Sequence, residues 1–150
     1  METSFNINLS SRKVLLTFLE TNSLVQLNEI PKGFSNNLIW NIGHIIVSQQ
    51  GLVYRLSGLP MNISPEMMEK YKNGSKPTAT TQEEIEELKV LLFSLLNQTK
   101  EDYANGKFTS YNEYTTGTGF HLANLKDAME FNNYHEGIHL GFMMNIRKFI

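Results

Sequence analysis

The sequence predicts an all-α fold: a four-helix bundle with a long crossover between its second and third helices. Four segments carry apolar residues at the spacing of an amphipathic helix, and none shows the strict alternation of a half-buried strand. The connection over residues 59–80 is rich in Pro, Asn, Gly and Ser, and its length suits a crossover rather than a tight hairpin. A chain of 150 residues can bury a sizeable core, so one domain spanning residues 1–150 is expected.

The bounds of the four helices follow from their capping residues and from the breakers between them. The first helix is expected over about Ser10–Thr21, and the second over about Ser35–Leu56, ahead of a glycine and a proline. Thr80 or Thr81 begins the third helix, with acidic residues in its first turn. The fourth helix begins near Asn124 and runs almost to the C-terminus.

Helical phase divides the second and fourth helices into sides. His44 points away from the main apolar side of the second helix, so this helix is expected to be buried on both sides, by its own core and by a second subunit. The other residues on the His44 side are Trp40, Asn41, Val47, Ser48, Gly51 and Arg55. On the fourth helix, His135 and His139 are expected in the middle of a core-facing stripe. That stripe consists of Leu125, Ala128, Phe131, Ile138, Phe142, Ile146 and Phe149.

The composition excludes several classes of function. The net charge is −2 and there is no cluster of Lys and Arg, so neither nucleic acid nor an anionic membrane is an expected partner. The absence of cysteine excludes disulfides, thiolate metal sites and a cysteine nucleophile. The first ten residues are mostly polar and contain no apolar stretch that could serve as a signal peptide, and no apolar run is long enough to span a bilayer, so we expect a cytoplasmic protein.

His135 and His139 are the strongest candidates for chemistry. At positions i and i+4 of one helix, their Cβ atoms lie roughly 6 Å apart, so both imidazoles can reach one ion. Two imidazoles on a core face are costly unless a metal or core hydrogen bonds use their nitrogens. His44, on another helix with Ser48 and Gly51 as small neighbours, is the candidate for a third ligand. Three histidines leave positions open for water or substrate, which is the pattern of a catalytic or exchangeable site.

Residues 135–139 also match the zinc metalloprotease pattern His-Glu-x-x-His. The extended form of that pattern fails, because Phe142 and Asn145 stand where glycine and histidine are required. No acidic residue follows His139, so a downstream carboxylate ligand is absent too, and proteolysis is disfavoured. Glu136 remains a candidate general base, because helical phase lets it flank the ion and activate a bound water. The alternative is a solvated helix carboxylate.

Two motifs together resemble the DinB-like family of metal-binding four-helix bundles. They are Trp-x-x-Gly-His at residues 40–44 and His-x-x-x-His-x-Gly at residues 135–141, and the resemblance covers nearly the whole chain. It implies an up-down-down-up bundle that often forms a homodimer. It also implies a divalent ion, zinc or nickel, held by His44, His135 and His139.

Some members of that family are thiol S-transferases that act with bacillithiol or similar low-molecular-weight thiols. The resemblance therefore implies metal-dependent transfer of a thiol to a small electrophilic molecule, or hydrolysis of a small-molecule substrate. Because this chain has no cysteine, any thiol must come from a co-substrate. The alternative is a non-enzymatic metal-binding or stress-associated dimer, in which the ion is structural or the pocket only binds.

The sequence also leads to expectations for Arg55, for His121 and for the pH dependence of metal binding. Arg55 lies about three turns beyond His44 on the same side of its helix, where it is expected to pair either a substrate carboxylate or a structural acid. His121 is either a pocket residue or a surface histidine of the loop before the fourth helix. An unperturbed imidazole protonates near pH 6.5, so bound metal is expected to be lost below about pH 6.

Overall fold

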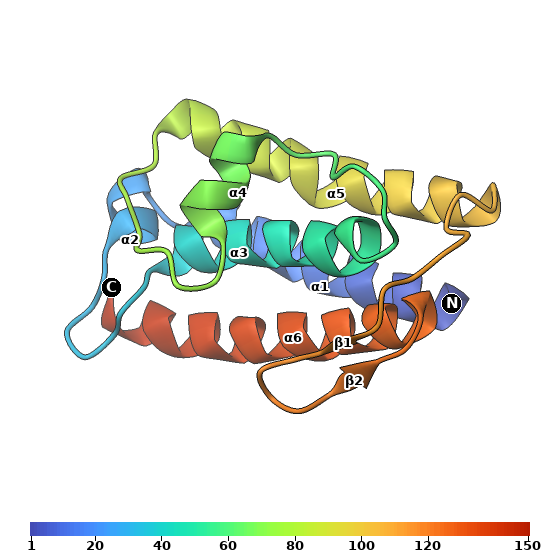
Figure 1. The fold of residues 1–150 in the computed structure, drawn as a ribbon. Helices are drawn as coiled ribbons and strands as arrows, with labels where there is room; N and C mark the ends of the chain where they lie inside the picture. The colour runs from blue at the N-terminus through green and yellow to red at the C-terminus, as the bar shows by residue number, and fades with distance from the viewer.

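The computed structural model describes all 150 residues and is dominated by four long helices (Figure 1). These are α1 (Glu2–Thr21), α3 (Leu38–Gln50), α5 (Gln82–Ala104) and α6 (Leu125–Ile146). A single π-helical turn, η1 (Gly51–Arg55), continues α3. The shorter elements are α2 (Leu24–Asn28), α4 (Pro65–Tyr71), β1 (Tyr114–Thr115), β2 (His121–Leu122) and a terminal 3-10 turn (Arg147–Phe149).

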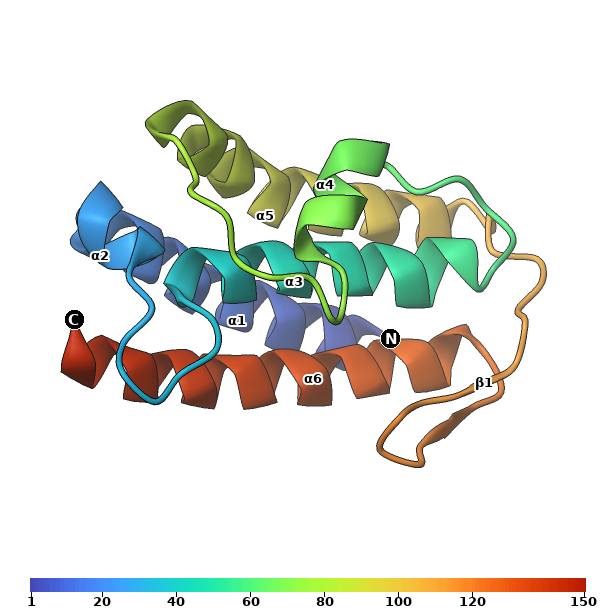
Figure 2. The same ribbon diagram turned by 60° about the vertical axis from the view of Figure 1, so that its left-hand side comes forward.

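The four long helices form an up-down-down-up bundle, as the family resemblance implies. α1 and α6 run in one direction while α3 and α5 run in the other, and the contacts place the helices round the bundle in the order α1, α5, α3, α6 (Figure 1). Because α3 and α5 are parallel, the chain between them returns along the bundle. This crossover carries α4, which packs on α3 (Figure 2). The antiparallel pair β1–β2 precedes α6 and lies beside its first turns.

Local capping explains where α3, α5 and α6 begin. Asn37 accepts a hydrogen bond from the backbone of the third helical residue of α3, and Asn124 does the same for α6. Thr81 and Glu84 form a reciprocal capping box at the start of α5. None of the helices combines the length and the apolar character that crossing a membrane requires.

The first helix begins at Glu2, much earlier than the sequence predicts. Two polar residues of its first turns, Ser4 and Asn8, point inward rather than into solvent. Ser4 donates to Glu130 at 2.7 Å, and Asn8 donates to Glu136 at 2.7 Å, so both side chains are buried against α6. The segment looked non-helical because its inner face is polar.

The predicted core-facing stripe of α6 is wrong in phase. Ile138 is 48% exposed and Phe142 is 38% exposed, although both were expected in the core. The buried side of α6 keeps Ala128 and Ile146 from the predicted stripe and otherwise carries Met129, Asn132, Glu136 and Met143. Two of its central positions are polar, which is why apolar periodicity pointed to the neighbouring face. His135 and His139 lie at the edge of the buried side, where they are half-buried.

The second side of α3 is covered within the same chain. α4 and α6 both pack on this helix, and all but one of its residues are buried. A second subunit is therefore not what buries the His44 side of α3. The bundle places that side against α6, and this arrangement builds the site.

Candidate metal centre

Three histidines from two antiparallel helices converge. His44 comes from α3, while His135 and His139 come from successive turns of α6. One ring nitrogen of each lies within 4.8 Å of the other two. The Nε2 atoms of His135 and His139 are 3.2 Å apart. Two nitrogens bound tetrahedrally to zinc, with bonds of roughly 2.05 Å, lie about 3.3 Å apart. The structure thus brings together the three histidines that the sequence singled out.

The orientation of His139 is fixed by Asn41. The Nδ2 of Asn41 donates to the backbone oxygen of Asn37 at 2.7 Å and to the side chain of Asn36 at 3.0 Å, so its Oδ1 faces His139. This oxygen lies 2.7 Å from the Nδ1 of His139. Because an amide oxygen only accepts, Nδ1 carries the hydrogen and the lone pair of Nε2 points toward the other histidines.

A backbone carbonyl fixes His44 in the same way. The Nδ1 of His44 donates to the carbonyl of Tyr71, at 2.8 Å, which leaves Nε2 as the lone-pair nitrogen. The indole of Trp40 stacks on the imidazole, with ring centroids 4.8 Å apart and planes inclined by 6°. Gly43 permits this arrangement, because a Cβ there would lie 2.4 Å from the ring of Tyr71. The residues of the Trp-x-x-Gly-His motif therefore act together to position and orient the imidazole of His44.

His135 has one ring nitrogen without a partner. Its Nε2 faces His139, but its Nδ1 is buried and makes no hydrogen bond. Because the Nε2 of His139 accepts, the 3.2 Å contact places the hydrogen of His135 on Nε2 in the metal-free chain, and the unpartnered Nδ1 can take that hydrogen when Nε2 binds an ion. A ring whose second nitrogen lacks a partner has Nε2 available as a ligand once the proton moves to Nδ1.

Burial lowers the pKa of all three imidazoles. Desolvation lowers the pKa of His44, and the hydrogen bond to Tyr71 only partly offsets it. Desolvation, reinforced by repulsion from neighbouring histidines, lowers the pKa of His135 to about 4 and that of His139 to about 3. All three rings are therefore neutral at pH 7, which is the form of imidazole that binds metal. Donor atoms, tautomers and protonation together fit a divalent ion.

A cavity of about 670 Å³ opens on the triad. Its walls come from α3 with η1, from α6, from the segment after α4, and from the β1–β2 hairpin. No acidic side chain lines the cavity, and no fourth His, Cys, Asp or Glu joins the three imidazoles. The open side of the triad thus faces a space large enough for a small molecule.

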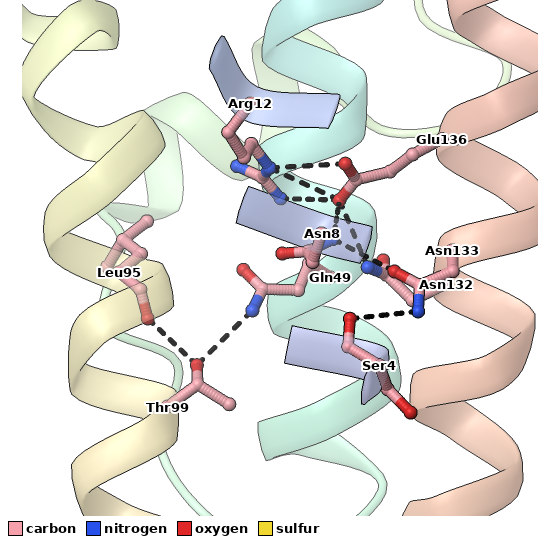
Figure 3. Close-up of polar contacts among 9 residues, drawn as sticks. All are labelled: Ser4, Asn8, Arg12, Gln49, Leu95, Thr99, Asn132, Asn133 and Glu136. Atoms are coloured by element: carbon pink, nitrogen blue, oxygen red, sulfur yellow. Dashed lines mark hydrogen bonds and ion pairs between the residues drawn. The ribbon is translucent and has the colours of Figure 1, made fainter. Parts of the chain in front are cut away.

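Glu136 does not lie where helical phase predicts. Its carboxylate is fully buried between α1 and α6 and does not line the cavity (Figure 3). It accepts hydrogen bonds from Arg12 at 2.7 and 3.2 Å, from Asn8 at 2.7 Å and from Asn132 at 3.0 Å. The prediction that Glu136 flanks the ion and acts as a base is therefore wrong. The alternative, a solvated carboxylate, is also wrong, because this side chain holds a buried guanidinium.

The sequence left two alternatives for Arg55 and two for His121, and the structure distinguishes them in each case. Arg55 lines the cavity and has no ion pair, so no structural acid is its partner. His121 lies on β2, is exposed, pairs with Glu113 at 3.3 Å and is outside the cavity lining, as a surface histidine would be. Sequence reasoning missed the orienting roles of Asn41 and Tyr71. A signal for Asn41 existed, because it is a polar residue within the most apolar helix of the chain.

Fold and site together define a four-helix bundle whose three convergent imidazoles can bind a metal ion. Comparison with known families matches residues 9–143 to the DinB superfamily. This match covers most of the chain, so the protein belongs to the DinB superfamily. No curated protein matches the sequence.

Proposed function

We propose that this protein is a metal-dependent enzyme that transfers a low-molecular-weight thiol to a small electrophilic substrate. One observation carries the proposal: the three neutral imidazoles have no fourth protein ligand, and their open side faces the cavity. A structural site is normally closed by four protein ligands, whereas a catalytic site keeps a position open. Hydrolysis of a small molecule would use the same open position and is the second reaction to be tested.

The residues of the chain would divide the work. His44, His135 and His139 hold the ion, while Asn41 and the carbonyl of Tyr71 keep two of these rings aimed at it. When bound there, a divalent ion such as zinc or nickel supplies Lewis acidity, which lowers the pKa of a thiol or water. The thiol comes from a co-substrate because the chain has no cysteine. A reducing cytoplasm, where small thiols stay reduced, is the setting we propose.

The first test is the metal content of protein purified without a histidine tag. We expect about one equivalent of divalent metal in the natural chain, and loss of that metal in His135→Ala. His121→Ala is the matched control, because this imidazole lies outside the cavity. Full metal occupancy in His135→Ala would contradict the three-histidine site.

The second test is catalysis by the metal-loaded protein. Bacillithiol and other small thiols are offered with electrophilic acceptors, and disappearance of the thiol is followed against metal-free protein. Metal-dependent turnover would support the transferase. Stoichiometric metal binding with neither thiol transfer nor hydrolysis would favour the non-enzymatic metal-binding protein instead.

We also propose that the protein forms a homodimer through the outer face of α6. Tyr134, Ile138 and Phe142 follow one another at four-residue intervals on this helix and are each more than a third exposed. An apolar stripe of this kind is costly in water and is commonly covered by another protein. Ile138→Asp should convert a dimer to a monomer in light scattering, and an unchanged mass would contradict this interface.

A further inference from the structure

Arg55 stands at the far end of the cavity from the metal ligands. It is the last residue of η1, the π-helical turn that continues α3, and it is exposed. The cavity-facing side of this helix begins at Trp40 and His44 and passes Ser48 and Gly51 before reaching Arg55. One of the three metal ligands, His44, and the cation at the other end of the pocket therefore lie on one continuous helix.

The guanidinium of Arg55 lies back along the helix over Gly51. Its Nη2 would be 3.4 Å from a Cβ placed on Gly51, so the absent side chain leaves room for it. Gly51 is two turns beyond His44, which puts the cation about 10 Å along the axis from the metal ligands. The charge is thus directed toward the triad rather than away from it.

No structural task accounts for this cation. It forms no ion pair with any acidic residue. The carbonyls at the end of the helix have other partners: the Gly51, Tyr54 and Arg55 oxygens accept from backbone N–H groups, and that of Leu52 accepts from the hydroxyl of Tyr111. Arg55 is therefore not needed to cap the helix.

The charges that line the cavity are of one sign. Apart from the histidines, only Arg55 and Lys72 are charged among its lining residues. Lys72 directly follows α4 and Tyr71, whose carbonyl contacts His44, and it is paired with Glu69. A divalent ion at the triad would add further positive charge, so the pocket has no internal negative charge to balance its cations.

We infer that Arg55 is the binding site for an anionic group of the substrate, a carboxylate or a phosphate placed about 10 Å from the atom that reaches the metal. The inference rests on the proposed function, because it assumes that one end of the ligand meets the triad. The neutral polar and apolar walls between the two ends would contact an uncharged middle section.

The test uses zinc-loaded protein and probes of graded length. Mercaptopropionate, mercaptohexanoate and mercaptooctanoate each carry a thiol and a carboxylate, and the longest places them about 10 Å apart when extended. The corresponding mercaptoalcohols are neutral controls. Binding is followed by the fluorescence of Trp40, which is the only tryptophan, lines the cavity and stacks on His44.

We expect mercaptooctanoate to bind the natural chain roughly tenfold more tightly than mercaptooctanol, since a charge-assisted hydrogen bond has about that effect. Arg55→Met, which keeps an apolar stem, should abolish this preference. Lys100→Met is the matched control, because it removes an exposed, unpaired cation of α5 that is outside the cavity. Equal binding of acid and alcohol by the natural chain would overturn the inference while leaving thiol binding intact.

A second pair of probes separates the anion site at Arg55 from the proposed thiol-transferase activity. Suberate, a dicarboxylate, is compared with octanediol, since neither contains a thiol. Preference for suberate that depends on Arg55, without any binding of the thiols, would retain the anion site and reject the thiol transferase. No preference for an acid in either arm would reject the anion site.

Discussion

The Nδ1 of His139 lies 2.7 Å from the side-chain oxygen of Asn41, across the interface between α6 and α3. This contact joins two residues separated by 98 positions in the chain. It sets the tautomer of one candidate ligand, and it does so from the helix that carries another. The same hydrogen bond thus links the two helices and orients the imidazole.

Asn41→Ala should weaken metal binding by about 10- to 100-fold, which is the usual effect of removing an orienting partner of a ligating histidine. His139 would then be free to rotate and to adopt the other tautomer. The dissociation constant is measured by competition with a chromogenic chelator. Asn97→Ala is the control, because Asn97 is exposed on α5 and makes no side-chain hydrogen bond. Equal affinities in the two variants would show that the contact does not orient the ligand.

Gly43→Ala should damage both the fold and the site. The new methyl group would overlap the ring of Tyr71, whose nearest atoms lie 2.4 Å from the Cβ position. We expect a loss of about 1–3 kcal/mol in the free energy of unfolding, as in other overpacked cores. Movement of Tyr71 would also withdraw its carbonyl from His44, so metal affinity should fall as well.

Gly137→Ala provides the matched control for this substitution. Gly137 is also inside a helix, but nothing lies within 4 Å of its Cβ position. Alanine should therefore stabilise the protein by up to about 1 kcal/mol through helix propensity alone. Chemical denaturation of both variants measures the difference. A Gly43→Ala protein as stable as Gly137→Ala would contradict the close contact with Tyr71.

Features encoded by neighbouring residues could be predicted from the sequence. The capping pair Thr81–Glu84 and the cap at Asn124 depend on residues within one turn, so the starts of α5 and α6 were predicted to within a residue or two. The His135–His139 pair is local in the same sense, because its spacing on one helix already aims both rings at one point.

Features that depend on distant partners could not be predicted. The phase of α6 follows from the burial of Glu136 against Arg12, which lies 124 residues away, and the early start of α1 follows from the bonds of Ser4 and Asn8 to α6. Apolar periodicity treats two such residues as solvent-facing, although together they form part of the core. The contact of Gly43 with Tyr71 could not be predicted for the same reason. The crossover that brings α4 onto α3 has no regular spacing of apolar residues from which its position could be inferred.

Removing one partner of the Arg12–Glu136 pair should destabilise the protein by about 3–5 kcal/mol. Both side chains are fully buried, so each single substitution leaves an uncompensated charge in the core. The double variant Arg12→Met/Glu136→Leu removes both charges. It should recover much of the loss, although the amides of Asn8 and Asn132 lose an acceptor. Additive effects in a double-mutant cycle would contradict the coupling.

The same variants test whether Glu136 takes part in chemistry. If this carboxylate only holds Arg12, the folded double variant should keep its metal affinity and any thiol-transfer activity within a few-fold of the natural chain. A general base, by contrast, raises the rate of a reaction by roughly 10²–10⁴-fold. If a folded, metal-loaded double variant has lost activity by such a factor, Glu136 takes part in the reaction.

The lowered pKa values of the histidines give the metal-free protein a characteristic pH dependence. In the unfolded chain an imidazole has a pKa near 6.5, whereas in the fold that of His135 is about 4 and that of His139 about 3. Between these values and about pH 6.5 the unfolded chain binds protons that the folded chain does not. The free energy of unfolding should therefore be constant above about pH 6.5 and fall as the pH is lowered toward 4. Thermal unfolding across this range measures it.

The same shifts extend the pH range of metal binding. Protons compete with the ion only where the folded protein binds them, and the pKa values of about 4 and 3 place that competition well below the pH 6 expected from unperturbed imidazoles. Zinc affinity should thus change little between pH 7 and about pH 5.5 and decrease steeply below about pH 4. Burial also lowers the pKa of His44, which shifts its competition with protons in the same direction. Affinity that already declines tenfold per pH unit from pH 6.5 downward would show that these histidines titrate as exposed side chains do.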